Sequence, residues 1–293
     1  MTSGLRLLAY PRGRARFVIS DQARPPTVPA YLSHLSRLRW TIAGQKVARH
    51  WFWAAPDANV TLAWEAANEL LGNAALSRSA IGYISDPEGQ RALVLDPREG
   101  EWIAKVPVDD ASADRIAREA GRYAEAAPHV AAGSVPLPET RRAGNGLLVQ
   151  RLVGPHPRWD DPGVHRWILT SLVTDRAQGL FHGDVTPWNV IVTRTGIKVI
   201  DWEKARFDRF VAPSTNVLDF VLRGAAVARV AARRVQRAVA DLVHRQVVDR
   251  RELAAAVAGY ARYREVVEAD QQRRDALSGR VTSYLRRIEV AGS

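Results

Sequence analysis

The 293-residue chain contains no cysteine. Disulfide bridges and thiolate metal sites are therefore excluded, and the fold must be held together without covalent cross-links. A chain of this kind suits a reducing compartment, so we expect a cytoplasmic protein.

Long hydrophobic runs are also missing from the sequence. A helix needs about 20 consecutive apolar residues to cross a bilayer, and no run approaches that length. The short apolar stretch at 5–10 is followed at once by proline and arginine, which is not the pattern of an export signal. We expect neither a membrane span nor export.

The chain does have ample hydrophobic residues and an excess of positive charge. Hydrophobic residues make up 46% of the sequence, enough for one bilobal unit or two domains. The net charge is +11, and residues 204–293 hold 18 basic and 10 acidic residues. Such a surface can attract nucleic acid, anionic lipid or acidic substrates. Because acids are interleaved with the arginines, solvated helix faces are the simpler explanation, and nucleic-acid binding is not favoured.

The most informative stretch is the loop Phe181–Asn189, with the sequence FHGDVTPWN. Asp184 and Asn189 lie five residues apart, and Pro187 disfavours a helix between them. A polar loop beside buried strands can carry an aspartate and an asparagine by coincidence. The complete pattern, including the strands that follow, favours a functional site.

Two β-rich runs follow this loop, at 190–192 and 197–200, joined by Arg-Thr-Gly. They predict a hairpin that returns Asp201 to the loop. A carboxylate, a carboxamide and a second carboxylate would then converge on one point. Oxygen ligands of this kind suit Mg²⁺, which takes one or two carboxylates together with substrate phosphates and water. One carboxylate would remain to act as a base.

These residues resemble the signature of the aminoglycoside phosphotransferase family, the small-molecule branch of the protein-kinase-like fold. That signature is a His-Gly-Asp loop with asparagine five residues on, followed by Ile-Asp-Trp-Glu. The resemblance implies that Asp184 orients the acceptor hydroxyl and accepts its proton. It also implies that Asn189 and Asp201 hold Mg²⁺ on the nucleotide phosphates. His182 would brace the loop, and Glu203, which completes the second motif, would support the site.

The same resemblance implies a bilobal α+β fold with a small antiparallel β lobe, one key helix and a larger, mainly helical lobe. We predict a nucleotide-binding lobe at 67–150 and a catalytic and acceptor-binding lobe at 151–293. Residues 1–66 form an N-terminal extension of unknown role, which the resemblance does not cover. Within it, 16–20 reads as a strand and 30–43 has helical spacing.

The predicted small lobe begins with β-runs at 76–84, 91–95 and 102–106, separated by turns rich in aspartate, proline and glycine. These runs predict an antiparallel meander. In a kinase-like lobe the first hairpin lies over the triphosphate, yet neither Gly-x-Gly-x-x-Gly nor a Walker motif occurs here. Gly82 and Gly89 fit turns as well as they fit phosphate contacts.

Lys105 lies between apolar residues on the third run, and a buried ammonium needs a partner. The next segment, 112–127, predicts a helix with Ile116 on its inward face. At about 100° per residue, Glu119 lies about 60° from Ile116, whereas Glu125 lies on the solvent side. We therefore pair Lys105 with Glu119, which by resemblance would position the α- and β-phosphates. The alternative is a surface lysine and a solvated glutamate.

Residues 147–154 read as a strand and the hinge between the lobes. By resemblance, the hinge backbone from Gln150 to Leu152 would contact the purine. The sequence does not decide between ATP and GTP. A helix predicted at 163–178 precedes the loop Phe181–Asn189, called the catalytic loop below after the role that the resemblance implies.

Beyond the second motif, Asp219 resembles the family's carboxylate that ties the catalytic loop to the following helix. An ordinary aspartate at a helix start is the alternative. Residues 222–290 predict two or three amphipathic helices that would form the acceptor-side wall.

The implied reaction is transfer of the γ-phosphoryl group from Mg-ATP, or Mg-GTP, to a hydroxyl of a small molecule such as an antibiotic, a sugar or a related metabolite. The net charge favours a neutral or anionic acceptor over a polycationic one. His-Gly-Asp in place of His-Arg-Asp, and no Ala-Pro-Glu, argue against a protein acceptor. Two alternatives remain: a nucleotide-binding pseudokinase that regulates a partner, and, less favoured, a nucleic-acid-binding protein.

The first test concerns the predicted metal ligand. Asp201→Ala should abolish Mg²⁺-dependent nucleotide binding, because it removes the carboxylate that would carry the cation. Calorimetric titration with ATP, with and without Mg²⁺, measures the effect. An unaltered metal dependence would exclude Asp201 from the metal site.

Overall fold

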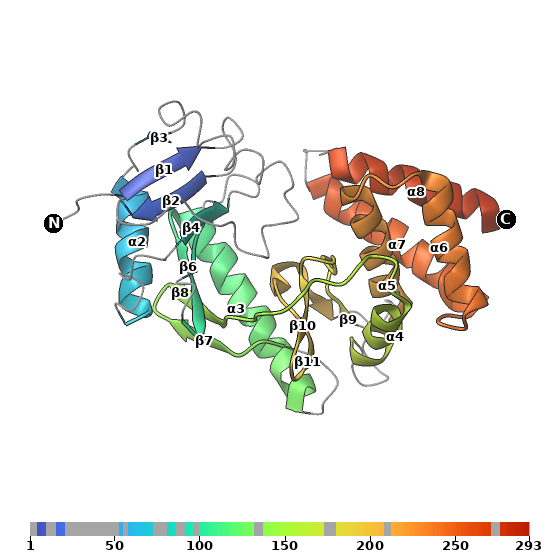
Figure 1. Cartoon of the computed structure of the whole chain (residues 1–293), viewed down its shortest axis with the longest axis horizontal. Helices are drawn as coiled ribbons and strands as arrows, with labels where there is room; N and C mark the ends of the chain where they lie inside the picture. The colour runs from blue at the N-terminus through green and yellow to red at the C-terminus, as the bar shows by residue number, and fades with distance from the viewer. Residues whose placement is uncertain are drawn as a thin grey trace. The chain divides into compact units, whose positions relative to one another are not determined.

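The computed structural model describes residues 5–9, 16–20, 53–54, 58–72, 81–85, 92–96, 100–131, 137–172, 180–207, 212–270 and 276–292. The chain divides into two compact units, each described by itself below (Figure 1). The first comprises Met1–Tyr123 and Pro138–Val153, and the second Ala124–Leu137 and Gly154–Ser293. No helix in the described ranges has the length and apolar character needed to cross a membrane.

An antiparallel sheet of eight strands dominates the first unit, in the order β3-β1-β2-β4-β5-β6-β8-β7. Its strands are β1 (Leu5–Ala9), β2 (Arg16–Ser20), β3 (Trp53–Ala54), β4 (Ile81–Ser85), β5 (Ala92–Asp96), β6 (Trp102–Pro107), β7 (Thr140–Ala143) and β8 (Gly146–Gln150). The predicted meander is confirmed as β4, β5 and β6, which pair in sequence order. The predicted strand at 16–20 is β2, which pairs with β4 in the same sheet. The sequence predicts no role for residues 1–66.

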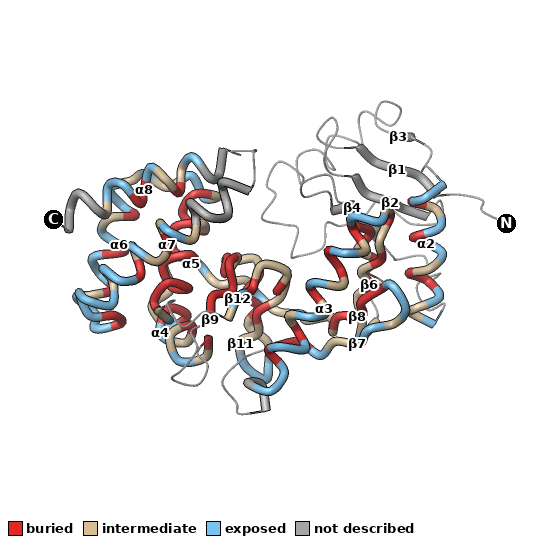
Figure 2. The backbone as a smooth tube through the Cα atoms, turned by 180° about the vertical axis from the view of Figure 1, so that it is seen from behind, coloured by how far each residue is buried: buried red, intermediate tan, exposed pale blue. Residues whose placement is uncertain are grey.

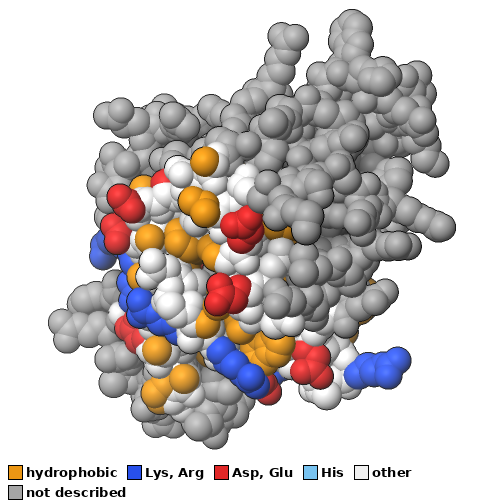
Figure 3. All heavy atoms as spheres, turned by 90° about the vertical axis from the view of Figure 1, so that its left-hand side faces the viewer, with side chains coloured by type: hydrophobic (Ala, Val, Ile, Leu, Met, Phe, Trp, Pro, Cys, Tyr) orange, Lys and Arg blue, Asp and Glu red, His pale blue; other side chains and the backbone are white. Residues whose placement is uncertain are grey.

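Helix α2 (Ala58–Leu70) packs on this sheet and was not predicted from the sequence. Its buried apolar residues share one face of the helix and form a single core cluster with Leu93, Leu95, Ala104 and Val106 of β5 and β6. They are Val60, Ala63, Trp64 and Ala67. That i, i+3, i+4, i+7 spacing was the available signal. Figure 3 views the first unit from this side, where apolar, acidic and basic side chains are interspersed among the coloured residues.

Helix α3 (Asp110–Ala131) confirms the predicted helix at 112–127 and is longer at both ends. Asp109 and Ser112 form its start, since the Ser112 N–H donates to Asp109 Oδ1 at 2.8 Å. The Asp109 N–H donates in return to Ser112 Oγ at 3.1 Å. This reciprocal capping satisfies backbone donors that the first helical turn leaves open. Ile116 and Tyr123 are buried on the inward face, as the helical spacing indicated.

In the part of the chain that the structure describes, the second unit is mainly helical and contains two short β-ribbons. The ribbons pair β10 (Val190–Thr193) with β11 (Gly196–Val199), and β9 (Leu180–Phe181) with β12 (Arg206–Phe207). Its helices are α4 (Pro162–Ser171), α5 (Ser214–Val227), α6 (Ala232–His244), α7 (Arg250–Asp270) and α8 (Ala276–Gly292). The predicted hairpin, the helix before the loop and the helices within 222–290 are thus confirmed where the structure describes them. The α+β class, with a β-sheet unit and a mainly helical unit, is confirmed.

Helix α5 is the centre of the second unit. Twelve of its 14 residues are buried, and Figure 2 draws it mainly in the buried colour. It contacts α4, α6, α7 and α8. A Cβ placed on Gly224 would overlap the side chain of Trp159 and lie 2.8 Å from Pro187 Cγ. The absence of a side chain at Gly224 therefore allows the catalytic loop to pack directly on α5.

Gly224→Ala should lower the free energy of unfolding by about 1–3 kcal/mol, the usual cost of overpacking. The matched control is Gly259→Ala in α7, where an added Cβ would lie an ordinary 3.7 Å from Thr215 Oγ1. Gly259→Ala should be stabilising by up to about 1 kcal/mol, because alanine favours a helix over glycine. Denaturant unfolding measures both. Equal effects of the two substitutions would show that Gly224 is not a close-packing position.

Candidate active site

Two polar side chains of α5 form hydrogen bonds with the backbone of the catalytic loop and of the residue before it. Asn216 accepts a hydrogen bond from the His182 N–H at 3.0 Å and donates to the Leu180 carbonyl at 2.7 Å. Three residues further along α5, Asp219 Oδ2 accepts the Val185 N–H at 2.9 Å. These bonds are buried, so they fix the loop backbone on both sides of Asp184. Asn216 was not predicted from the sequence; its position three residues before Asp219 was the only signal.

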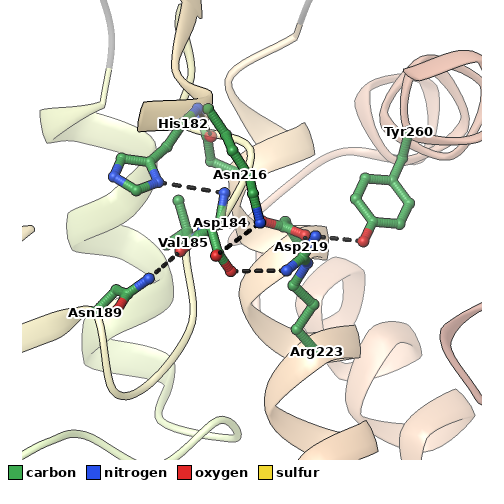
Figure 4. Close-up of polar contacts among 9 residues, drawn as sticks. His182, Asp184, Val185, Asn189, Asn216, Asp219, Arg223 and Tyr260 are labelled. Carbon is green, nitrogen blue, oxygen red and sulfur yellow. Dashed lines mark hydrogen bonds and ion pairs between the residues drawn. The ribbon is translucent and has the colours of Figure 1, made fainter. Parts of the chain in front are cut away.

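Asp184 lies between two cations that the sequence did not identify. Its Oδ1 contacts Arg223 Nη1 at 2.7 Å (Figure 4), and its Oδ2 contacts Lys204 Nζ at 3.4 Å. Burial by itself would raise the pKa of Asp184, but Lys204 and Arg223 outweigh it and lower that pKa to about 2. The carboxylate is therefore ionised near neutral pH and is a weak base. Such a carboxylate, held by two ion pairs, is better suited to orient a hydroxyl by accepting its hydrogen bond than to remove its proton.

Asp219 joins the loop to two helices. Besides the Val185 N–H, it accepts the Tyr260 hydroxyl of α7 at 2.8 Å, and it pairs with Arg223 Nε at 2.9 Å (Figure 4). Its side chain is 1% exposed, and burial raises the pKa of Asp219. Asp219 lies inside α5, five residues after Ser214, so the helix-start alternative is wrong. The tie between loop and helix that the resemblance implied is present.

Asn189 and Asp201 are brought together by the hairpin. The Ile200 N–H donates to the Asn189 carbonyl at 2.9 Å, which places the next residue, Asp201, alongside Asn189. Asn189 Nδ2 donates to the Asp184 carbonyl at 3.0 Å, so the amide oxygen is the atom left for a cation. Asp201 has left-handed backbone angles, φ 67° and ψ 61°, which aspartate tolerates better than most residues. An amide oxygen and a carboxylate are ligands that Mg²⁺ accepts.

The His182 ring is fully buried. Its Nδ1 accepts the Asp184 N–H at 3.3 Å, and the ring lies edge-to-face with Trp202 at 4.7 Å. Burial lowers the pKa of His182 to about 4, so the ring is neutral and carries its proton on Nε2. These contacts agree with the bracing position implied by resemblance. Glu203 lies in the 3-10 turn Trp202–Lys204 and is partly exposed; its supporting role stays a prediction.

In the first unit, the predicted ion pair is present. Lys105 Nζ lies 2.6 Å from Glu119 Oε1, with side chains 13% and 1% exposed. Glu125 is exposed on the other side of α3. The helical-wheel argument therefore selected the correct partner, whereas the contact of this pair with nucleotide phosphates stays a prediction.

The backbone N–H groups of the predicted hinge residues, 150–152, differ in whether they already donate a hydrogen bond. The Gln150 N–H donates to the Glu139 carbonyl at 2.8 Å, and the Arg151 N–H to the Glu101 carbonyl at 2.7 Å. Among the described residues, the Leu152 N–H takes part in no hydrogen bond, and its contact with a purine stays a prediction. Arg151 also pairs with the buried Asp96 at 2.9 Å.

Of the two glycines considered for phosphate contacts, Gly82 lies within β4. It pairs with Val18 on one side and Leu95 on the other, so its interpretation as a turn residue is wrong. Gly89 lies outside the described residues.

A comparison with protein-family models matches the part of the chain that contains the loop. Residues 147–266 match the model of the phosphotransferase enzyme family, and this range contains the catalytic loop, the hairpin and Asp219. The resemblance to the aminoglycoside phosphotransferases is thereby confirmed for this part of the chain. No curated protein sequence matches the chain.

Several solved structures are similar to the chain at low identity. A macrolide 2'-phosphotransferase, MphH from Brachybacterium faecium, is 16% identical over 73% of this chain and 98% of its own, with a TM-score of 0.39. An aminoglycoside 2'-phosphotransferase-IIIa in complex with GDP is 14% identical over 79% and 99%, with a TM-score of 0.43. A choline/ethanolamine kinase family protein from Mesorhizobium loti is 12% identical over 71% and 87%, with a TM-score of 0.34.

The buried neutral His182 predicts a loss of stability in mild acid. Between pH 6.5 and about 4, His182 is protonated in the unfolded chain but stays neutral in the folded protein. The free energy of unfolding therefore falls as the pH falls. The loss is up to about 3 kcal/mol, at roughly 1.4 kcal/mol per pKa unit. The stabilisation from Asp184, whose pKa is about 2, is lost only at lower pH.

His182→Asn should remove this dependence, because the amide oxygen can still accept the Asp184 N–H and does not titrate. Thermal midpoints of the native protein and the variant, recorded from pH 7 to pH 4.5, should converge as the pH falls. Parallel curves would show that His182 does not resist protonation in the folded state.

Proposed function

We propose that this protein is a kinase that transfers the γ-phosphoryl group of ATP to a hydroxyl of a small molecule. The observation that carries the proposal is the catalytic loop: Asp184 is held in a fixed ion-paired position, and Asn189 and Asp201 lie side by side next to it. The match of residues 147–266 to the phosphotransferase enzyme family supports phosphoryl transfer to a small molecule. ATP as donor and an alcohol as acceptor group are part of the proposal.

Asp184 would accept a hydrogen bond from the acceptor hydroxyl and aim its oxygen at the γ-phosphorus. Phosphoryl transfer passes through a loose transition state, so the attacking hydroxyl needs orientation more than early deprotonation. A carboxylate with a pKa of about 2 fits this task, and it can take the proton once the new P–O bond has made the oxygen acidic. Positioning of this kind supplies a large part of the rate enhancement in such enzymes.

Asn189, through its amide oxygen, and Asp201 would hold Mg²⁺. The cation, when bound, neutralises the charge of the β- and γ-phosphates. The chain's own contribution is to hold the two residues next to each other: the Ile200 N–H donates to the Asn189 carbonyl, and the Asn189 amide nitrogen donates to the Asp184 carbonyl.

In the first unit, Lys105 would contact the α- and β-phosphates, kept in place by Glu119 at 2.6 Å. The Leu152 N–H would donate to the purine, because the Gln150 and Arg151 donors are already used. GTP in place of ATP would use the same contacts.

The acceptor we propose is neutral or anionic. The chain carries a net charge of +11, and two cations lie against Asp184. A polycationic molecule would meet repulsion there unless acids in its pocket offset it. A nucleotide-binding pseudokinase is the second candidate, favoured by the absence of a Gly-x-Gly-x-x-Gly loop from the sequence.

The test is transfer of label from γ-labelled Mg-ATP into aminoglycosides, macrolides, sugars and a small-molecule extract. Asp184→Asn should reduce transfer by about 10²–10⁴-fold, the range for loss of a positioned acid or base. The Kd for Mg-ATP should change by less than about threefold, because the hydroxyl side and not the nucleotide is affected.

Asp160→Asn is a matched control, since Asp160, like Asp184, pairs with two basic side chains, Arg158 at 3.0 Å and Arg234 at 3.1 Å, but on an exposed surface. It should keep full activity. Equal activity of Asp184→Asn and native protein would remove Asp184 from the mechanism. Mg-ATP binding without transfer to any acceptor would favour the pseudokinase.

A further inference from the structure

Arg223 makes two contacts that span the active site. Its Nη1 lies 2.7 Å from Asp184 Oδ1 and its Nε 2.9 Å from Asp219 Oδ1. One planar guanidinium thus bridges the carboxylate that faces the acceptor and the carboxylate that anchors the loop (Figure 4). Arg223 follows Asp219 by one helical turn of α5, so the bridge is built on a single buried helix.

The Asp219 end of this bridge is fixed. Asp219 accepts hydrogen bonds from the Val185 N–H and the Tyr260 hydroxyl, and its side chain is 1% exposed. Arg223 is 22% exposed and has little freedom once its Nε is paired. The position of its Nη1 is therefore determined by the core of the second unit.

Lys204 is a different kind of neighbour. Its ammonium lies 3.4 Å from Asp184 Oδ2, longer than an ordinary charged hydrogen bond, and its side chain is 33% exposed. A flexible point charge at this distance stabilises the ionised carboxylate but does not define its rotation. The rotation of the Asp184 carboxylate is therefore set at Oδ1, by Arg223, which leaves Oδ2 to meet an acceptor hydroxyl.

We propose that Arg223 is the positioning residue of this site: it orients the Asp184 carboxylate so that Oδ2 faces the acceptor hydroxyl. The inference rests on the proposed function, because it assigns the orientation of the residue that receives the hydroxyl. A lysine cannot replace Arg223, since one ammonium cannot reproduce a rigid fork that holds two carboxylates at once. Arg223 would touch neither the hydroxyl nor the phosphate, and its effect on the reaction would pass through Asp184.

The experiment is a double-variant cycle between Arg223 and Asp184. Label release from γ-labelled Mg-ATP to water, and label transfer to a small-molecule extract, give kcat and the KM for ATP. Arg223→Met should lower kcat by about 100-fold, as misplacement of a catalytic group does, with the KM for ATP within about threefold. Arg223→Lys should still lose at least about tenfold in kcat, although it keeps the charge.

The decisive comparison is made in the Asp184→Asn background. If Arg223 works only by orienting Asp184, replacing Arg223 in the Asp184→Asn protein should lower kcat by less than about threefold further. The reason is that the effects of two groups that act as a unit do not multiply. A merely structural role would lower kcat by the same factor in both backgrounds. Thermal midpoints of all four proteins show whether each is folded. If Arg223→Met is unfolded, Arg223→Lys takes its place in the cycle.

Arg280→Met is the matched control. Arg280 Nη1 donates to the Ala226 carbonyl of α5 at 3.1 Å, so this substitution also removes an arginine contact with the same helix. It should leave kcat within about threefold of the native value.

The outcomes separate the two proposals. Multiplicative losses in the cycle, or native kcat in Arg223→Lys, would overturn the role of Arg223 while the native protein still transfers phosphate. A native protein that moves label neither to water nor to any molecule of the extract would overturn the proposed function, and the role of Arg223 with it.

Discussion

The hydrogen bonds of one buried carboxylate, Asp219, connect most of the candidate site in the second unit. Asp219 accepts the Val185 N–H of the catalytic loop and the Tyr260 hydroxyl of α7, and it pairs with Arg223. A buried carboxylate is costly unless every lone pair finds a donor, so these three contacts depend on one another. Removing one partner of such a network typically costs about 3–5 kcal/mol. The loop, α5 and α7 are therefore held as one piece.

This constraint explains the electrostatics of Asp184. Because Arg223 is fixed by Asp219, a cation stands beside the Asp184 carboxylate, and Lys204 adds a second. The resulting low pKa makes Asp184 a poor base, which fits the orienting role that we propose for it. The close packing of Gly224 on Trp159 and Pro187 keeps the other side of the loop equally rigid. Rigid support of this kind is what a precisely aimed group needs.

Much of the site was predictable because it is encoded locally. Asp184, Asn189 and Asp201 lie within 18 residues of one another on a loop and a tight hairpin, where short spacing leaves few geometries. Helical periodicity likewise selected Glu119 over Glu125 as the partner of Lys105. Helix α2 was not predicted, although Val60, Ala63, Trp64 and Ala67 form an apolar stripe with helical spacing.

The sequence by itself determined the elements with short-range signals: the β4–β6 meander, helix α3 and the loop with its hairpin. Only the tertiary structure decided which distant side chains reach Asp184 and the loop. Arg223, Asn216 and Tyr260 lie 32 to 76 positions beyond Asp184 in the chain. Apart from the position of Asn216 three residues before Asp219, nothing in their local sequence distinguishes them from the other polar residues of their helices. Their role follows from the packing of α5 against α7 and the catalytic loop. Packing of this kind is a long-range property that residue spacing does not encode.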